Sequence, residues 1–126
     1  MARKLKKAQV KNLAEKLSGL LKAGDIVLLS GQFGSGKTFF SRSLIQSCLK
    51  MSDADIEDVP SPSYTLVQVY DSIIPNIWHI DLYRITELSE IIELGFEDMY
   101  SNIISLIEWP ERLQENIPVR YISINF

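Results

Sequence analysis

The chain has 126 residues, of which 46% are hydrophobic and 23% charged, with six glycines and five prolines. These proportions are ordinary for a soluble globular domain and argue against disordered or low-complexity sequence. The length predicts one domain over residues 1–126, because domains cluster near about 100 to 150 residues. No apolar run approaches the about 20 residues of a membrane span, and the basic start leads into no signal-peptide block. We therefore expect a cytoplasmic protein without membrane contact.

Charge is unevenly distributed along the chain. The formal net charge is −3, but residues 1–50 carry ten Lys and Arg against two acids, whereas residues 51–126 carry three against fourteen. Two interpretations stay open. Either solvated helix faces happen to differ in sign, or the basic half faces phosphates while the acidic half meets a partner.

The spacing of apolar residues and the turn signals predict alternating helices and strands. In the first half of the chain we expect a helix over 7–23 ended by Gly24, a buried strand over 25–30, a helix over 38–50 and a loop over 51–63. Two hairpin strands follow over 64–70 and 77–80, and then a helix over 86–95 ended by Gly95. The chain is expected to finish with a buried strand over 102–109, a short helix over 110–116 and a final strand over 119–126. This order predicts an α/β domain with a mixed sheet.

The stretch GQFGSGKTFF, residues 31–40, matches the phosphate-binding pattern GxxxxGK[ST]. Glycines let the backbone wrap an anion with its N–H groups, and the positive end of the following helix dipole adds to this attraction. A lysine at this place reaches the β- and γ-phosphates, and the threonine hydroxyl binds Mg²⁺. A chance match is disfavoured because an apolar strand precedes the motif and an apolar-faced helix follows it. The predicted nucleotide-binding residues are Gly31, Gln32, Phe33, Gly34, Ser35, Gly36, Lys37, Thr38 and Phe39.

Two predicted strands end in acids, at Asp81 and at Glu108. A phosphate loop needs a carboxylate for Mg²⁺ and a group that orients water, and both belong at the ends of neighbouring strands. The alternative is that each acid marks only where a strand meets solvent. We predict Lys37, Asp81 and Glu108 as catalytic residues and Thr38 and Glu108 as metal-binding residues. Which carboxylate holds Mg²⁺ and which orients water stays open.

Several other residues have two interpretations. His79 lies in a predicted strand and is expected to be a packed or hydrogen-bonded core histidine rather than a metal ligand, because no second His or Cys is near. Cys48 is expected to be a buried thiol. Trp109 is either packing or part of the site, and Arg84 is either a surface ion pair or a phosphate contact. Hydroxyls that could belong to a mobile loop near the phosphates occur at Ser61, Ser63, Tyr64 and Thr65.

The P-loop taken with VPSPSYTLVQVY, HIDLYRITELSEIIELGFEDMY and IISLIEWPERLQENIP, in that order, resembles the TsaE family, small bacterial ATPases of tRNA threonylcarbamoyladenosine biosynthesis. The resemblance runs from about Gly24 to the end of the chain. It implies a P-loop NTPase-like, three-layer α/β fold whose central sheet is mainly parallel and flanked by antiparallel strands.

The resemblance also implies functional roles. ATP and Mg²⁺ are the expected cofactors, SPSYT is the first switch, the segment around Asp81 with Arg84 is the second, and Glu108 is the metal-linked acid with Trp109 beside it. The expected partners are TsaD and TsaB. TsaD transfers the threonylcarbamoyl group to the adenosine next to the anticodon, so tRNA is reached indirectly. The expected activity is an ATPase that is weak alone.

Two other functions fit a P-loop in a chain of this size. A small-molecule kinase needs an arginine-rich lid, yet only three arginines follow Arg42. A nucleotide-dependent binding module without hydrolysis would act wholly through its partner surface. A GTPase is disfavoured because no NKxD segment reads guanine, and direct tRNA binding is disfavoured because the second half of the chain is acidic.

Overall fold

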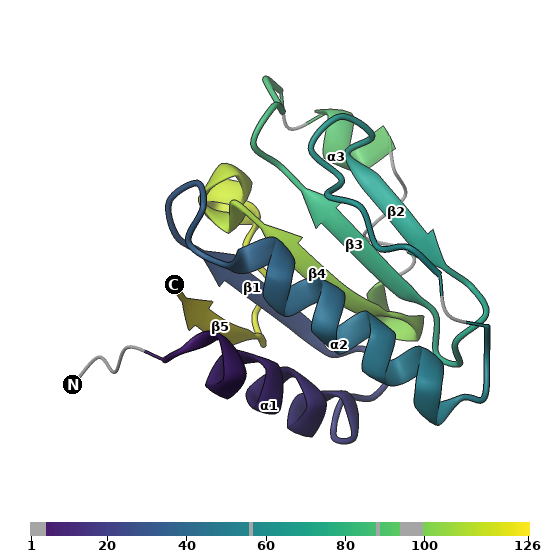
Figure 1. Ribbon diagram of the computed structural model, residues 1–126. Helices are drawn as coiled ribbons and strands as arrows, with labels where there is room; N and C mark the ends of the chain where they lie inside the picture. Colours follow the sequence, from purple (N-terminus) through teal and green to yellow (C-terminus); the bar gives the residue numbers. More distant parts are fainter. Residues whose placement is uncertain (1–4, 56, 88, 94–99) are drawn as a thin grey trace.

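The computed structural model describes residues 5–55, 57–87, 89–93 and 100–126. Its elements, in chain order, are α1 (Lys7–Ser18), β1 (Ile26–Ser30), α2 (Lys37–Met51), β2 (Val67–Tyr70), β3 (Ile77–Asp81), α3 (Ser89–Glu93), the 3₁₀ segment η1 (Tyr100–Asn102), β4 (Ile104–Glu108), the 3₁₀ segment η2 (Pro110–Asn116) and β5 (Ile122–Asn125). The five strands form one sheet with the order β2-β3-β4-β1-β5. In Figure 1, α1 and α2 run side by side along this sheet.

The sheet is mainly parallel, as predicted. Strands β3, β4, β1 and β5 pair in parallel, and β2 pairs antiparallel with β3. Two interior strands, β1 and β4, are buried along nearly their whole length, which is why they read in the sequence as continuous apolar runs. A mixed α/β domain with flanking helices is therefore confirmed.

Residues alternate between the two faces of the sheet with the strand period of two. Val27 and Leu29 of β1, with Leu106 of β4, join the larger apolar cluster on the face that α2 covers. Ile26 and Ile107 join the smaller cluster on the opposite face. The side chains outside the sheet that cover this face include the buried Leu82, Ile85 and Leu113.

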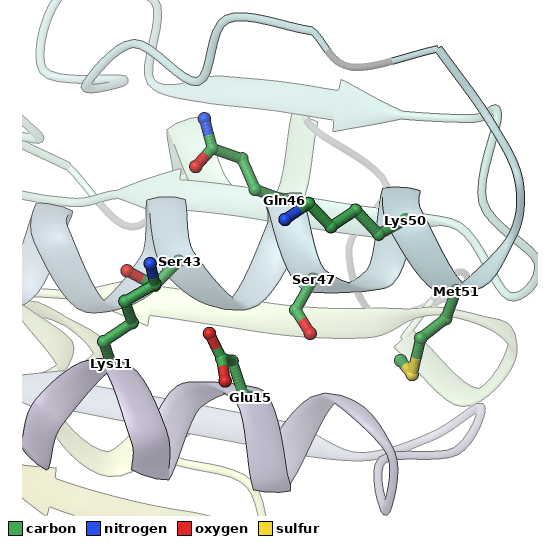
Figure 2. Close-up of a pocket in the computed structure, with 7 residues that line it drawn as sticks. All are labelled: Lys11, Glu15, Ser43, Gln46, Ser47, Lys50 and Met51. Carbon is green, nitrogen blue, oxygen red and sulfur yellow. The ribbon is translucent and has the colours of Figure 1, made fainter. Parts of the chain in front are cut away.

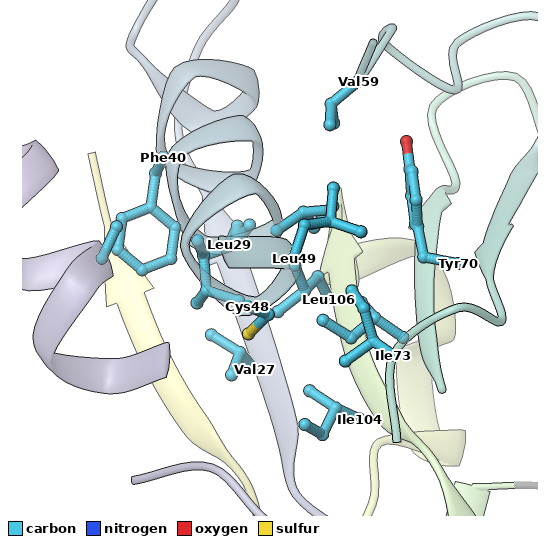
Figure 3. Packing of buried hydrophobic residues seen from close by; sticks show 14 residues of the cluster. Val27, Leu29, Phe40, Cys48, Leu49, Val59, Tyr70, Ile73, Ile104 and Leu106 are labelled. Carbon is cyan, nitrogen blue, oxygen red and sulfur yellow. The ribbon is translucent and has the colours of Figure 1, made fainter. Parts of the chain in front are cut away.

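The inner face of α2 was predicted correctly. Phe40, Cys48 and Leu49 point from the helix toward the strands in Figure 3, and all three are buried. The Cys48 thiol is 4% exposed, and burial raises its pKa to about 11. It is thus the buried thiol expected from the sequence. Helix α1 packs on α2, where the hydroxyls of Ser18 and Ser47 are 2.8 Å apart.

Some predicted boundaries were wrong. The first helix ends at Ser18 with Gly19 as its C-cap, not at Gly24, and Leu20 is 69% exposed instead of packed. The apolar stripe extended past the helix end because the chain must leave the helix to reach β1, and periodicity does not register that turn. Gly24 still takes a positive φ of 94°, in the turn before β1.

Four of the five strands are shorter than predicted, and β3 is one residue longer because it includes Asp81. The strand expected from residue 64 begins at Val67, because Leu66 takes a positive φ of 70° in the turn that closes the preceding loop. Strand β5 covers Ile122–Asn125 and is a largely exposed edge strand. In the helix expected over 86–95, α3 spans Ser89–Glu93, and the expected end at Gly95 lies outside the described residues. Among the helices that the structure describes, none has the length and apolar character of a membrane span.

Candidate functional site

The loop after β1 turns the chain into α2 through glycines with positive φ. The φ angles are 147° at Gly31, 73° at Gly34 and 109° at Gly36. A Cβ on Gly31 would lie 2.7 Å from the hydroxyl of Ser35, so no side chain fits there. Helix α2 then begins at Lys37, and the N–H groups of its first turn have no partner within the helix. This is a backbone arrangement that binds anions.

Lys37 is buried beneath this loop at 5% exposure. Its ammonium donates to the carbonyl of Gly31 and lies 3.6 Å from the ring centroid of Trp109. Burial lowers the pKa of Lys37, and the negative charges of Glu108, Glu111 and Asp81 act in the opposite direction. No ion pair to this ammonium occurs within the described ranges. A bound anion would therefore relieve the cost of burying its charge.

Glu108 ends β4 and is buried next to the start of α2. Its Oε1 accepts a hydrogen bond of 3.4 Å from the Thr38 hydroxyl, and its Oε2 lies 2.6 Å from Nε2 of His79. Glu108 is opposite Leu29 in the β1–β4 ladder, so it follows the row of side chains that faces α2. This register places an acid beside the Thr38 hydroxyl although 70 residues separate the two along the chain.

Asp81 ends the neighbouring strand β3 and lies opposite Glu108 in the ladder. Its Oδ2 accepts a hydrogen bond of 3.1 Å from the Ser63 hydroxyl, and its Oδ1 accepts one of 2.9 Å from the backbone N–H of Tyr83. The Ser63 hydroxyl is also 2.7 Å from that of Ser61. Asp81 thus ties the loop before β2 to the end of β3, whereas Glu108 contacts α2. The two acids have different partners.

These groups surround a cleft of about 360 Å³ at the carboxyl ends of the parallel strands. Open α/β sheets bind ligands at this edge. The lining residues are Lys7, Phe33, Gly34, Ser35, Gly36, Lys37, Thr38, Phe39, Ser61, Ser63, Asp81, Glu108 and Trp109. The Ser35 hydroxyl is buried and has no partner in the part of the chain that the structure describes. It is available to donate to an anion held by the loop.

Two aromatic rings that line the cleft, those of Phe33 and Trp109, form a cluster with Tyr83. The ring centroids of Phe33, Tyr83 and Trp109 lie 4.6 to 5.1 Å from one another. Trp109 takes a positive φ of 60° directly after β4, and its ring lies against the Lys37 ammonium. The rings come from the phosphate loop, the segment after β3 and the end of β4, so they join three segments around the cleft.

Five sequence-predicted residues do not line the cleft. Gly31 and Gln32 contribute through their carbonyls, which accept from the Lys37 ammonium and from the Ser35 N–H. Tyr64 is 85% exposed, and the Arg84 guanidinium lies 4.5 Å from its ring centroid. Together with Ser63 and Asp81, these two line a separate hollow of about 150 Å³. Thr65 is exposed and accepts a hydrogen bond from Gln68.

The residues at the cleft fit Mg²⁺ by the chemistry of their donor set. A hydroxyl from Thr38 and a carboxylate from Glu108 are hard oxygen ligands, and Mg²⁺ is usually held by one or two carboxylates together with waters and substrate phosphates. No cluster of three or more His, Cys, Asp or Glu side chains that could cage a metal occurs among the described residues. The site therefore suits a metal that arrives with a phosphate ligand.

Comparisons with known proteins agree with this geometry. A family model described as "Threonylcarbamoyl adenosine biosynthesis protein TsaE" matches residues 5–126. The chain belongs to the TsaE family. A relative in Rickettsia prowazekii, named tRNA threonylcarbamoyladenosine biosynthesis protein TsaE, is 40% identical over 120 residues, which are 94% of this chain and 80% of that protein. A Haemophilus influenzae protein of the same name is 36% identical over 101 residues, covering 79% and 61%.

A solved structure has the same fold. The crystal structure of YdiB from Bacillus subtilis superposes with a TM-score of 0.73 and covers 98% of this chain and 73% of its own, at 22% identity. At that identity the likeness concerns the fold alone. It supports the layered α/β arrangement that the TsaE resemblance implied.

A larger hollow of about 520 Å³ lies elsewhere in this TsaE-family chain, between α1 and α2. Figure 2 shows its side chains projecting from the two helices, among them Lys11, Glu15 and Lys50. Size does not make it the better site, because it has no glycine loop and no helix N-terminus, and Glu15 would repel a phosphate. The smaller cleft therefore suits a phosphate ligand better.

Three residues at or behind the cleft were missed as site residues by sequence reasoning. His79 is the buried, hydrogen-bonded core histidine that was expected, but its partner is the site acid Glu108, which was not foreseen; its position two residues before Asp81 could have indicated the shared strand face. Tyr83 joins the aromatic cluster, and Lys7 reaches the cleft from α1. Nothing in the local sequence indicates these last two roles.

Proposed function

We propose that this chain is a Mg²⁺-dependent ATPase that serves tRNA threonylcarbamoyladenosine synthesis, acting with TsaD and TsaB and not transferring the group itself. One observation carries the proposal. At a single cleft the Lys37 ammonium has no ion-pair partner among the described residues, the Thr38 hydroxyl meets Glu108, and Ser63 from the preceding loop meets Asp81. An ammonium, a hydroxyl–carboxylate pair and a loop tied to a second carboxylate are the parts that ATP hydrolysis by a P-loop requires.

The residues have distinct tasks in this proposal. The backbone N–H groups of residues 34–38 bind the phosphates, and Lys37 leaves the Gly31 carbonyl to neutralise their charge. Thr38 and Glu108 hold Mg²⁺, which when bound offsets the charge that develops on the phosphate oxygens. Asp81 orients the attacking water or, through Ser63, senses the terminal phosphate. The contact between Glu108 and Thr38 favours Glu108 over Asp81 for the metal.

The family gives the proposal its biological setting. The relatives' name assigns them to threonylcarbamoyladenosine biosynthesis, and only three arginines follow Arg42 in this chain, too few for the arginine-rich lid of a kinase. This disfavours a small-molecule kinase. A cycle of ATP binding and hydrolysis would instead change the shape of the loop at Ser61 and Ser63 and of the segment after Asp81, and partners would read that change.

Phosphate release tests the proposal. We expect slow Mg²⁺-dependent release from ATP by the chain alone and faster release once TsaD and TsaB are added. Lys37→Ala should weaken ATP binding by about 10-fold or more, and Glu108→Ala should reduce turnover far more than nucleotide affinity. Unchanged release on adding the partners would favour the non-hydrolysing binding module, and phosphate transfer to a metabolite would favour the kinase. Normal hydrolysis by both variants would refute the site.

A further inference from the structure

The lone histidine of the chain contacts the acid that the proposed function assigns to the metal. Nε2 of His79 lies 2.6 Å from Oε2 of Glu108, and the two side chains are 0% and 3% exposed. The other oxygen of the same carboxylate, Oε1, accepts from the Thr38 hydroxyl. Each oxygen of Glu108 therefore has its own partner, one from β3 and one from α2.

The sheet register explains how His79 reaches this acid. His79 lies directly opposite Leu106 in the β3–β4 ladder, and Asp81 lies opposite Glu108. His79 and Asp81 share one face of β3 because they are two residues apart, so the histidine contacts Glu108 along the diagonal of the ladder. A buried strand pair thus holds the imidazole beside the carboxylate.

Which ring nitrogen of His79 carries hydrogen follows from the task proposed for Glu108. A carboxylate that binds Mg²⁺ is ionised and only accepts, so Nε2 of His79 would be the donor. Nδ1 is buried without a partner in the described part of the chain. With the ring hydrogen on Nε2, the unpartnered Nδ1 is an acceptor rather than a buried N–H, which is the less costly of the two arrangements.

We propose that His79 is a positioning residue for the metal side of the site. By donating to Oε2 it fixes the plane of the Glu108 carboxylate and leaves Oε1 directed at Thr38, where Mg²⁺ would be held. This inference rests on the proposed function. Groups that orient metal ligands in this way typically change metal affinity or activity by about 10- to 100-fold when removed.

The competing explanation is that His79 only fills the core and pairs a buried acid. Both explanations predict that its removal destabilises the fold, so stability does not separate them. The two explanations differ in the Mg²⁺ dependence of nucleotide binding and in whether a substituted side chain that still donates a hydrogen bond restores it. Glutamine can still donate from an amide near the position of Nε2, whereas leucine fills similar space without a donor. Leu106→Val perturbs the directly opposite residue without touching the carboxylate, and it is the control for a weakened strand pair.

The experiment measures binding of a fluorescent ATP analogue to the full chain as Mg²⁺ is added. We expect His79→Leu to raise the half-saturating Mg²⁺ concentration by about 10- to 100-fold, with His79→Gln within about threefold of wild type. Leu106→Val should keep the wild-type Mg²⁺ dependence despite lower stability, and analogue binding in EDTA should be equal in all four proteins. If the leucine variant does not fold, His79→Asn replaces it, because its shorter amide does not reach Oε2.

The outcomes separate this inference from the function beneath it. If the wild type binds the analogue with Mg²⁺ but the leucine variant keeps the same Mg²⁺ dependence, the positioning role is refuted while the ATPase proposal stands. The same conclusion follows if glutamine fails to restore what leucine loses. If the wild type binds no analogue with or without TsaD and TsaB, both proposals are refuted together.

Discussion

Replacing Lys37 by methionine should separate ligand binding from folding. Methionine keeps the unbranched length of the side chain and removes the charge. Lys37 is 5% exposed, and its ammonium has a carbonyl and the face of Trp109 as partners. A desolvated cation–π contact contributes about 2 kcal/mol, and desolvation of a buried ion costs several kcal/mol. Because burial lowers the pKa of Lys37, the net environment disfavours the charge.

We therefore expect Lys37→Met to leave the free energy of unfolding of the free protein within about 1 kcal/mol of wild type, or to raise it. The pH dependence has a definite sign. The pKa of Lys37 is lower in the folded protein than in the unfolded chain, so between that lowered value and about 10.4 the unfolded chain binds more protons. Across that interval wild-type stability should rise with pH, and the variant should lack this rise.

Lys37→Met should weaken nucleotide binding even though it leaves the stability of the free protein nearly unchanged. A hydrogen bond to a charged group contributes about 1.5 to 3 kcal/mol, so losing the ammonium should weaken MgATP binding about 10- to 100-fold. MgATP at 100 times the wild-type Kd adds about 2.7 kcal/mol to wild-type stability, and at the same concentration the variant should gain only about 0.4 to 1.4 kcal/mol.

Urea unfolding with and without MgATP measures these quantities directly. Lys50→Met is the matched control, because Lys50 is an exposed lysine of the same helix and lies away from the cleft. It should behave as wild type in both conditions. The reasoning would be refuted if free Lys37→Met lost more than about 2 kcal/mol, or if MgATP stabilised it as much as wild type.

Other predictions concern the loop, the switch contact and the core. Gly31→Ala should lower the free energy of unfolding, measured in urea, by about 3 kcal/mol, because it adds backbone strain and a 2.7 Å clash with the Ser35 hydroxyl. Gly34→Ala should lower it by only about 1 kcal/mol, because a Cβ there meets nothing within 4 Å. Equal losses for the two variants would contradict this prediction. Ser63→Ala should remove the 3.1 Å contact to Asp81 and lower partner-stimulated phosphate release while Kd for MgATP stays within about threefold; unchanged release would exclude this contact from turnover. The Cys48 thiol, with its pKa raised to about 11, should react with a thiol reagent at pH 8 only in urea, and rapid labelling of the native protein would show that it is accessible.

The sequence alone predicted the parts of the site that lie close together along the chain. The glycines of the loop, Lys37 and Thr38 are adjacent, and their conformation follows from local backbone preferences and from the strand and helix on either side. The buried strands and the inner face of α2 were also predictable, because each follows a simple periodicity. Asp81 and Glu108 were recognised as strand-end acids for the same reason.

Only the tertiary structure decided which of these acids meets which partner. The strand order and the ladder register bring Glu108 beside Thr38 and His79, and they bring Asp81 beside Ser63. A shift of one residue in register would turn each acid to the opposite face, and the amino-acid order does not specify that register by itself. The aromatic cluster and the reach of α1 to the cleft arise in the same way, since they depend on how separate elements pack in space.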